Sequence, residues 1–372
     1  MLGKRQALAL TLLMASTHGP SSLGDDVVVT RPARYEVFQR SQFDPANSHA
    51  NHPDGPALGF AMVPLEFRCP AGATDLSWQC RVVAARPASV PPQRWQELIV
   101  KRSEGTCRAA AKVKAGGWYR LELQGIGQGR VVASSQTEPF GVGEVFLIAG
   151  QSYAAGENDA LLAIEDPLGR VVCLDASNRS WRRADDPLPN VGEGGSIWPP
   201  MANALLPCIE VPIGLVNVAA SGTASRQWLP GTPLFERLRG AGAAVAGFRM
   251  VLWQQGEFDV IEDVATHEYV QNLVAIKEAL DEQWNTESTW LIAKSTLHPT
   301  VYNAPVAEGR IRAAIDELSK RPGFFLGPDT DILGGENRGG LDSRRHFSEI
   351  GQRRAGLLWF ASIWHFLQHG HE

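Results

Sequence analysis

The sequence predicts a three-layer α/β/α sandwich built on a parallel sheet, preceded by a small all-β sandwich domain. Between residues 25 and 142, short segments of alternating apolar and polar residues are separated by clusters of Pro, Gly and Asn, a pattern typical of antiparallel strands. From residue 143 onward, continuous apolar runs alternate with segments of helical periodicity, which indicates a parallel sheet covered on both faces. We therefore expect a signal peptide at residues 1–24, a β-sandwich domain at 25–142 and the α/β/α domain at 143–372.

The first residues have the pattern of a secretory signal peptide. Lys4 and Arg5 precede an apolar run from Ala7 to Ala15, and small residues follow. This run is shorter than the roughly 18 apolar residues of a membrane helix, and no later stretch reaches that length. We expect a secreted or periplasmic protein without a membrane span; a frayed N-terminal helix is the alternative.

Composition narrows the class of partner. The chain of 372 residues has a formal net charge of −5 and no block of Lys and Arg, so nucleic acid is not an expected partner. Its 11 Trp residues outnumber 5 Tyr; indole rings stack on sugars, but they more often fill cores. Neither composition nor spacing gives the oligomeric state.

The N-terminal strands are expected within residues 35–40, 65–69, 78–84 and 118–124. The five cysteines of the chain are compatible with disulfides in an oxidising compartment. Cys69 and Cys80 are a candidate pair that would bridge neighbouring strands, and buried free thiols are the alternative. The cysteines and histidines form no cluster typical of a metal site, so we expect neither a metal ion nor an organic cofactor.

The C-terminal part alternates strands and helices. Apolar strands are expected within residues 144–150, 211–219, 246–256, 289–296 and 324–327. A helix at 266–284 carries an apolar face at helical spacing, and further helices are expected at 305–320 and 348–368, the last capped by Ser348. The long stretch from Glu157 to Leu206 interrupts this rhythm, and we expect it at the rim of the active site.

Four polar or small residues lie at or just after the ends of predicted strands: Ser152, Gly222, Gln255 and His298. Ligands of parallel sheets bind outside the carboxyl ends of the strands, so these residues predict the site. Ser152 lies in a Gly-containing turn after a buried strand, which suits an exposed hydroxyl nucleophile, although a serine there is often a plain helix cap. The sequence around it is Gly-Gln-Ser-Tyr-Ala and lacks the second glycine of an α/β-hydrolase elbow.

Four segments of the chain resemble the SGNH hydrolases. They occur in the order typical of the branch that contains sialate O-acetylesterases and acetylxylan-type carbohydrate esterases. The segments are AGQS at residues 149–152, NVAASGTASRQWLPG at 217–231, MVLWQQGEFD at 250–259 and HFSEIGQRRAGLLW at 346–359. The resemblance spans Gly143 to about Trp364 and implies an SGNH-type, flavodoxin-like fold for this part.

The resemblance also implies roles for individual residues. Ser152 would be the nucleophile and His346 the general base, with Asp342 orienting the imidazole. The oxyanion hole would combine the backbone N–H groups of Ser152 and Gly222 with the side-chain amide of Gln255. Two further residues would contact or support the substrate site: Glu257 and Trp228, the latter either under a sugar or simply packed beneath the loop.

Two positions depart from the family pattern. Tyr153 follows the nucleophile where relatives have Asn, and Asp342 precedes His346 by four positions rather than two or three. Either Asp342 reaches the imidazole through a coiled loop, or the site is a Ser–His dyad. His298 is the rival base. Asp329 and Asp331 are expected to form a turn, with a place at the rim of the site as the alternative.

The implied reaction is removal of O-acetyl groups from carbohydrates through an acyl-Ser152 intermediate. The expected partner is an acetylated carbohydrate, either a polysaccharide or a sialic-acid-like sugar. A non-catalytic carbohydrate-binding protein on the same fold and an esterase for other acyl or thioester substrates are the alternatives.

Overall fold

The computed structural model describes residues 27–41, 58–69, 75–86, 92–189, 191–299, 303–340 and 345–370. The signal peptide expected at residues 1–24 and the candidate acid Asp342 lie outside these ranges.

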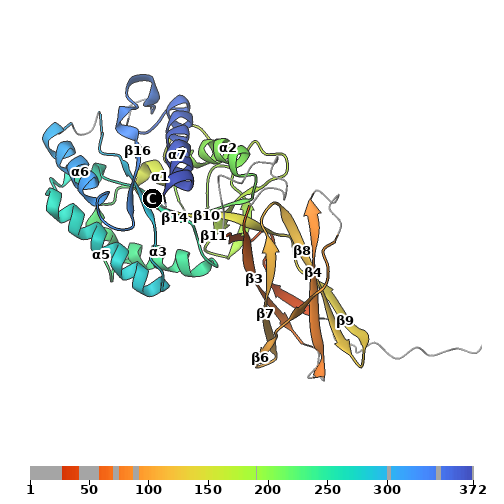
Figure 1. Ribbon diagram of the computed structural model, residues 1–372. Helices are drawn as coiled ribbons and strands as arrows, with labels where there is room; N and C mark the ends of the chain where they lie inside the picture. Colours follow the sequence, from red (N-terminus) through yellow and green to blue (C-terminus); the bar gives the residue numbers. More distant parts are fainter. Residues whose placement is uncertain are drawn as a thin grey trace, which may run out of the picture.

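The N-terminal region consists of two antiparallel arrays of strands (Figure 1). One is a four-stranded sheet in the order β1-β3-β7-β6. Its strands are β1 (Val28–Arg31), β3 (Phe60–Arg68), β7 (Thr106–Lys114) and β6 (Lys101–Ser103). The second array pairs β5, β4, β8 and β9 in that order. These are β5 (Gln96–Leu98), β4 (Ser77–Arg86), β8 (Trp118–Gly127) and β9 (Arg130–Gln136).

Alternating residues of these strands form the core between the two arrays. On β3, Val63, Leu65 and Phe67 are fully buried and belong to one apolar cluster with residues of β4 and β8. The ring of Phe67 lies 4.7 Å from that of Trp78 on β4. This period-two burial is the pattern that the sequence predicts for a β-sandwich.

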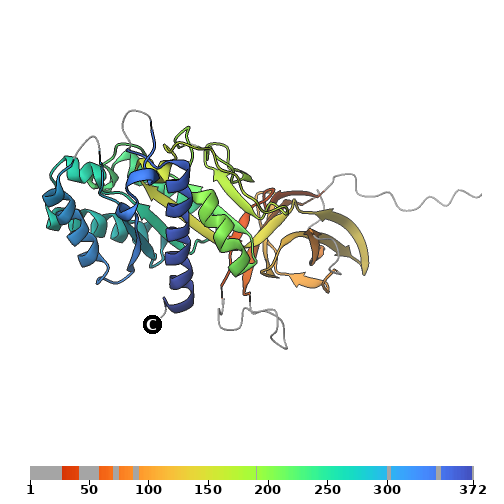
Figure 2. The same ribbon diagram turned by 90° about the horizontal axis from the view of Figure 1, so that it is seen from above.

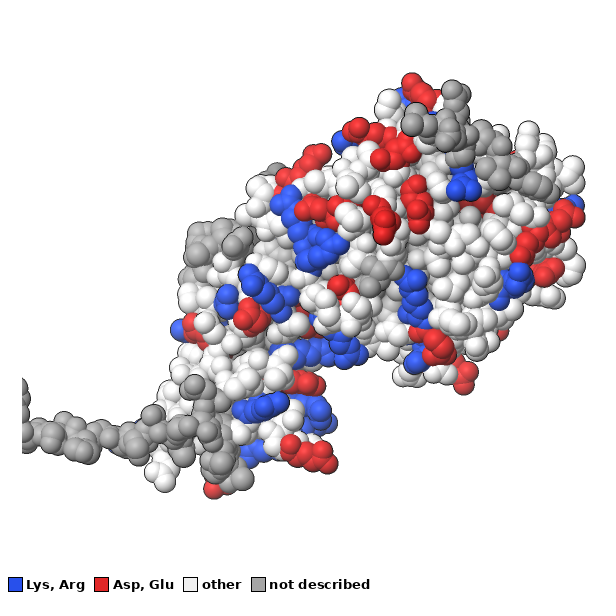
Figure 3. Space-filling model, turned by 180° about the vertical axis from the view of Figure 1, so that it is seen from behind, with Lys and Arg blue, Asp and Glu red and all other residues white. Residues whose placement is uncertain are grey.

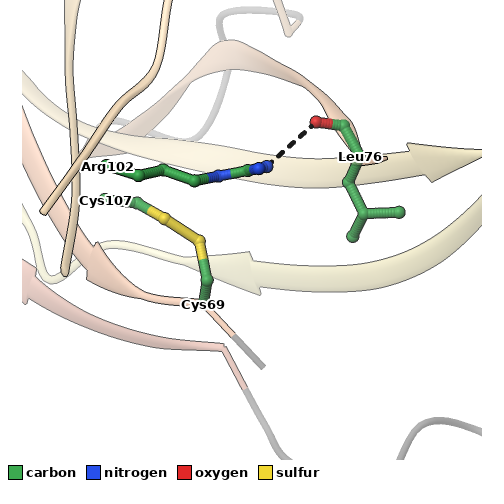
Figure 4. Close-up of a disulfide and its surroundings, with 4 residues drawn as sticks. All are labelled: Cys69, Leu76, Arg102 and Cys107. Atoms are coloured by element: carbon green, nitrogen blue, oxygen red, sulfur yellow. Dashed lines mark hydrogen bonds between the residues drawn. A yellow bond between two sulfur atoms is a disulfide. The ribbon is translucent and has the colours of Figure 1, made fainter. Parts of the chain in front are cut away.

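The disulfide differs from the expected pair. Cys69 is bonded to Cys107, with the two Cα atoms 6.2 Å apart, while Cys80 is a buried free thiol. Strands β3 and β7 are hydrogen-bonded neighbours, whereas Cys80 lies on β4 in the opposite array. The pairing of Cys69 with Cys80 is therefore wrong. Figure 4 shows the disulfide beside Arg102, which donates a hydrogen bond of 3.3 Å to the carbonyl of Leu76.

The C-terminal region contains the predicted parallel sheet, with strands in the order β12-β11-β13-β10-β14-β15-β16. All neighbouring pairs are parallel except β11 with β12. The strands are β10 (Phe140–Gly150), β11 (Val171–Asp175), β12 (Ser180–Arg183), β13 (Ile213–Asn217), β14 (Met250–Gln254), β15 (Trp290–Lys294) and β16 (Phe324–Asp329).

Helices cover both faces of this sheet (Figures 1 and 2). Phe146 and Ile148 of β10 share a cluster with residues of α2 (Trp198–Ile209) and α7 (Glu349–His369). The alternate residues Val145 and Leu147 belong to a second cluster. That cluster includes residues of α3 (Pro233–Ala244), α5 (Thr266–Trp284) and α6 (Pro305–Leu318). The predicted α/β/α fold class is confirmed.

One of two local expectations changed. The stretch 157–206 does not only form a rim, because it contributes β11 and β12 to the sheet and the beginning of α2. Asp329 ends β16, and its side chain accepts a hydrogen bond from the backbone N–H of Asp331 in the following 3₁₀ turn, as expected for a turn former.

Strand β10 joins the two regions. Its first residues pair with β8 and with β2 (Val37–Gln39), and its later residues pair with β13 and β14. The predicted boundary after residue 142 falls inside this strand. At the junction, the buried carboxylate of Glu144 accepts hydrogen bonds of 2.7 Å from Arg40 Nε and 2.8 Å from Arg249 Nε.

The face of the molecule seen in Figure 3 carries acidic and basic side chains interspersed with one another. No helix within the described residues is long and apolar enough to cross a membrane.

Candidate active site

Ser152 is placed by the end of the central strand. Strand β10 ends at Gly150, and Ser152 begins the short helix α1 (Ser152–Ala155). Gly150 has φ +131°, and a side chain there would overlap the backbone carbonyl of Gln254 on β14. Only glycine suits this conformation and this close approach of two strands. The turn therefore carries Ser152 to the carboxyl end of the sheet.

A pocket of about 350 Å³ lies at this end of the sheet. Residues that follow five parallel strands line it, with Phe258 and Ile261 after β14 among them. They include Ser152 after β10, Gly222 after β13, His298 after β15 and His346 after β16. The structure thus brings together the predicted nucleophile, the glycine and both candidate bases.

Among the described residues, two of the backbone N–H groups at the pocket donate no hydrogen bond. Neither Ser152 N nor Gly222 N donates a hydrogen bond within the part of the chain that the structure describes. Gly222 has φ +66° and open space where a side chain would begin. Its left-handed conformation, rather than crowding, is what favours glycine there. Unpaired N–H groups beside a hydroxyl are suited to stabilise a developing oxyanion.

The side chain of Gln255 does not reach the pocket. It is fully buried, and its amide nitrogen donates to the carbonyl of Thr223 at 3.0 Å, to Oε1 of Gln151 at 3.3 Å and to Oδ2 of Asp259. The Thr223 carbonyl and Gln151 Oε1 can only accept hydrogen bonds. The atom of Gln255 that faces them must therefore be the amide nitrogen. The expected contribution of Gln255 to an oxyanion hole is therefore corrected, because its donor is used inside the protein.

Gln151 offers an amide nitrogen in its place. Its Oε1 accepts hydrogen bonds from the backbone N–H groups of Gly256 and Phe258, at 3.4 and 3.2 Å, at the beginning of α4 (Glu257–Ile261). These donors fix which end of the amide is oxygen. Gln151 lines the pocket, and its Nε2 makes no hydrogen bond to any other described residue.

Two imidazoles line the pocket, and both are held in the neutral form. Burial lowers the pKa of His346 to about 4, with further contributions from Arg345, His298 and Arg338. Burial and Arg345 likewise lower the pKa of His298 to about 4. A neutral imidazole can accept a proton. No hydrogen bond joins Ser152 Oγ to either ring in the described structure; such contacts commonly close when substrate binds.

The segment of His346 is anchored on both sides. Asn158 Oδ1 accepts a hydrogen bond from Phe347 N at 3.1 Å, and Asp159 N donates to the carbonyl of Phe347. Gly339 N donates to the carbonyl of His346 at 2.9 Å. The backbone around the imidazole is thus fixed, while the position of Asp342 lies outside the described residues.

Trp228 and Glu257 lie beneath the site rather than in it. Trp228 is fully buried; its indole N–H donates to Thr223 Oγ1 at 3.2 Å, and its ring lies against Trp253. It therefore packs beneath the loop and does not form the floor of a sugar subsite. Glu257 is also buried and accepts a hydrogen bond of 2.7 Å from Ser295 Oγ. Burial raises its pKa to about 8, and Glu257 is not among the residues that line the pocket.

Comparisons with known proteins agree with this architecture. The model of the family "Carbohydrate esterase, sialic acid-specific acetylesterase" matches residues 142–318. A probable carbohydrate esterase of Arabidopsis thaliana is 30% identical over 183 residues, which is 41% of this chain and 69% of the relative. The chain belongs to this carbohydrate esterase family.

A solved structure extends the likeness in fold. A carbohydrate acetylesterase from Xanthomonas citri aligns with a TM-score of 0.54 and 15% identity, covering 90% of this chain and 74% of the other. Its N-terminal coverage shows that the β region and the α/β/α region occur together in that protein. The family match itself includes Ser152 and Gly222 and ends before His346.

Sequence reasoning missed several residues of the esterase pocket. Glu157, Phe258, Ile261 and Arg345 also line it. Gln151 is adjacent to Ser152 and Arg345 is adjacent to His346, and this adjacency could have indicated that both residues lie at the pocket. Phe258 and Ile261 lie on α4 and reach the pocket through the packing of that helix, which no local pattern indicates.

Proposed function

We propose that this carbohydrate esterase is a serine O-acetylesterase, with Ser152 as nucleophile and His346 as general base. The observation that carries the proposal is the pocket in which the Ser152 hydroxyl, two unpaired backbone N–H groups and two neutral imidazoles meet. These are the parts that acyl transfer through a serine requires.

The reaction would proceed in two steps. The imidazole of His346 takes the Ser152 proton as the hydroxyl oxygen attacks the acetyl carbonyl, and then gives that proton to the departing sugar oxygen. Water, deprotonated by the same imidazole, attacks the acetyl-Ser152 ester and releases acetate. The proton then returns to the Ser152 oxygen.

The negative oxygen of each tetrahedral intermediate needs preorganised donors. We assign Ser152 N and Gly222 N to this role, together with Nε2 of Gln151. Gln255 acts behind them, since its amide donates to the same Gln151 oxygen that holds α4.

The substrate class rests on the family and on pocket size. The family model describes sialic acid-specific acetylesterases, and a pocket of about 350 Å³ lies at the small end of ligand sites. We propose an acetyl ester on a carbohydrate. The Cys69–Cys107 disulfide and the expected signal peptide support action outside the cytoplasm.

The test compares wild type with Ser152→Ala on p-nitrophenyl acetate and on acetylated carbohydrates. Ser152→Ala should lose nearly all activity and keep the thermal midpoint near that of wild type. A serine-reactive phosphonate should label wild type at Ser152, as detected by mass spectrometry. An inactive, unlabelled wild type that still binds sugar would favour a non-catalytic binding protein. Faster turnover of long acyl esters or thioesters than of acetyl esters would contradict the substrate class.

A further inference from the structure

The side chain of Tyr153 connects the nucleophile to both pocket histidines. Tyr153 directly follows Ser152 on α1, and it is 1% exposed. Its hydroxyl lies 2.6 Å from the carbonyl oxygen of Arg345 and 3.1 Å from that of Leu297. These are the residues immediately before His346 and His298. One phenol oxygen therefore meets the backbone of both histidine-bearing loops.

Arg338 completes this contact. Its Nη1 donates to the Tyr153 hydroxyl at 2.7 Å and to the carbonyl of Arg345 at 3.1 Å. Its Nε donates to the carbonyl of Leu333 at 2.6 Å. Because the phenol has a single proton, it accepts from Arg338 and donates to a carbonyl, of which Arg345 is the nearer. The arginine thus fixes the direction in which the hydroxyl points.

The guanidinium of Arg338 is itself buried and well packed. The residue is 6% exposed, and its guanidinium carbon lies 4.5 Å from the ring centroid of Phe347 and 5.1 Å from that of Tyr153. Its hydrogen bonds to described residues go to carbonyls and to the phenol rather than to a carboxylate. Its positive charge is therefore not neutralised by a hydrogen-bonded acid in this part of the structure.

We propose that Tyr153 and Arg338 are positioning residues of the esterase site, which hold the His346 loop in register with the Ser152 helix. The rings of Tyr153 and His346 pack in an edge-to-face arrangement, at 88° to each other with centroids 5.5 Å apart. The hydroxyl fixes the adjacent backbone. An asparagine at this position could not make the same contacts, because its side chain is far shorter. The inference rests on the proposed function.

Several charged or titratable groups surround the His346 imidazole. They are Arg345 of its own segment, His298 from the loop after β15, Arg338 from the segment before it, Tyr153 on α1 and Glu157 just after α1. Arg338 lowers the pKa of His346, after the larger effects of burial, Arg345 and His298. Removal of Arg338 should raise that pKa, because a nearby positive charge disfavours the protonated ring.

Tyr153→Phe tests the hydroxyl while keeping the ring. We expect kcat to fall about 10- to 100-fold with KM changed less than about threefold, since small misplacement of a catalytic group has effects of this size. Tyr119→Phe, which alters a tyrosine of the β region, is the matched control and should keep wild-type kcat. An active wild type whose Tyr153→Phe variant keeps kcat within about twofold overturns the inference.

The role of Arg338 is tested by titration rather than by rate alone. We would record the pKa of His346 by NMR in a Ser152→Ala background, which needs no esterase activity. Arg338→Met should raise this pKa, and Arg338→Lys, which keeps the charge, should restore it at least in part. Arg249→Met removes a partly buried arginine at the β10 junction and should lower the thermal midpoint without moving the His346 titration. An unmoved His346 pKa in Arg338→Met overturns the inference even if the esterase activity itself is absent.

Discussion

Replacing Gln151 by glutamate keeps the side-chain oxygen that holds α4 and removes the amide nitrogen that we assign to the oxyanion hole. The retained oxygen can still accept hydrogen bonds from Gly256 N and Phe258 N, which lie 3.4 and 3.2 Å from Oε1 of Gln151 in the wild-type structure. The lost donor belongs to a side chain that lines the pocket, and the new carboxylate would place negative charge beside the proposed oxyanion. The change therefore separates a structural role from a catalytic one.

The magnitude follows from the number of donors. We assign three donors to the hole, and the removal of one preorganised donor typically lowers kcat by about 10²–10³, equivalent to about 2.7–4 kcal/mol of transition-state stabilisation. Gln151→Glu should lose at least this much, with a smaller change in KM. Gln151→Ala should lose a similar amount of activity and, because α4 loses its acceptor, should also unfold at a lower temperature.

The assay is steady-state hydrolysis of p-nitrophenyl acetate, with thermal unfolding of each variant beside it. Gln255→Ala is the comparison. Its amide nitrogen is used by Thr223, Asp259 and Gln151, so it should lower stability and reduce kcat less than Gln151→Ala does. Wild-type kcat in both Gln151 variants, combined with a loss of about 10² or more in Gln255→Ala, would refute this reasoning and return the oxyanion role to Gln255.

Three further outcomes are expected. The acidic limb of kcat/KM should lie near pH 4 rather than near 6.5, because burial lowers the pKa of His346 to about 4. Only the neutral ring accepts the Ser152 proton. A limb near 6.5 in the measured pH profile would contradict this prediction. Asp342→Asn should lower kcat at least tenfold and shift that limb to still lower pH, whereas wild-type kcat with an unmoved limb would indicate a Ser152–His346 dyad. Glu144→Ala should lower the free energy of unfolding by about 3–5 kcal/mol, as measured by denaturant titration. The substitution leaves the buried Arg40 and its neighbour Arg249 without their carboxylate. A loss below about 1 kcal/mol would contradict this prediction.

The same junction has a predictable pH dependence. Burial alone would raise the pKa of Glu144, but Arg249 and Arg40 outweigh it and lower that pKa below its ordinary value of 4.5. A carboxyl whose pKa is lowered by folding contributes stability that is complete above its ordinary pKa and is lost as pH falls through the lowered value. Acid should therefore weaken the contact between the β region and the sheet below about pH 4.5.

Local sequence patterns determined the fold class and the position of the candidate nucleophile, Ser152. The apolar spacing around Leu273 placed α5 at Thr266–Trp284, and the apolar run before Gly150 placed the central strand. Both signals are local, because a strand or helix that packs against a sheet must repeat apolar residues with its own period. The rule that ligands bind at carboxyl ends of parallel strands then predicted that Ser152 and Gly222 share one pocket.

Only the tertiary structure decided which side chains of these segments face the pocket. Gln255 and Trp228 lie in segments that resemble the family, yet both side chains are fully buried. Gln151 accepts a hydrogen bond from Phe258 N, and the Tyr153 hydroxyl contacts the carbonyl of Arg345. The residues next to Gln151 and Tyr153 in the sequence predicted neither contact. Likewise Cys69 pairs with Cys107, 38 positions away, and not with Cys80. The reason is the same in each case: the partner of an amide, a hydroxyl or a thiol is set by strands and loops that are distant in sequence and meet only when the sheets have formed.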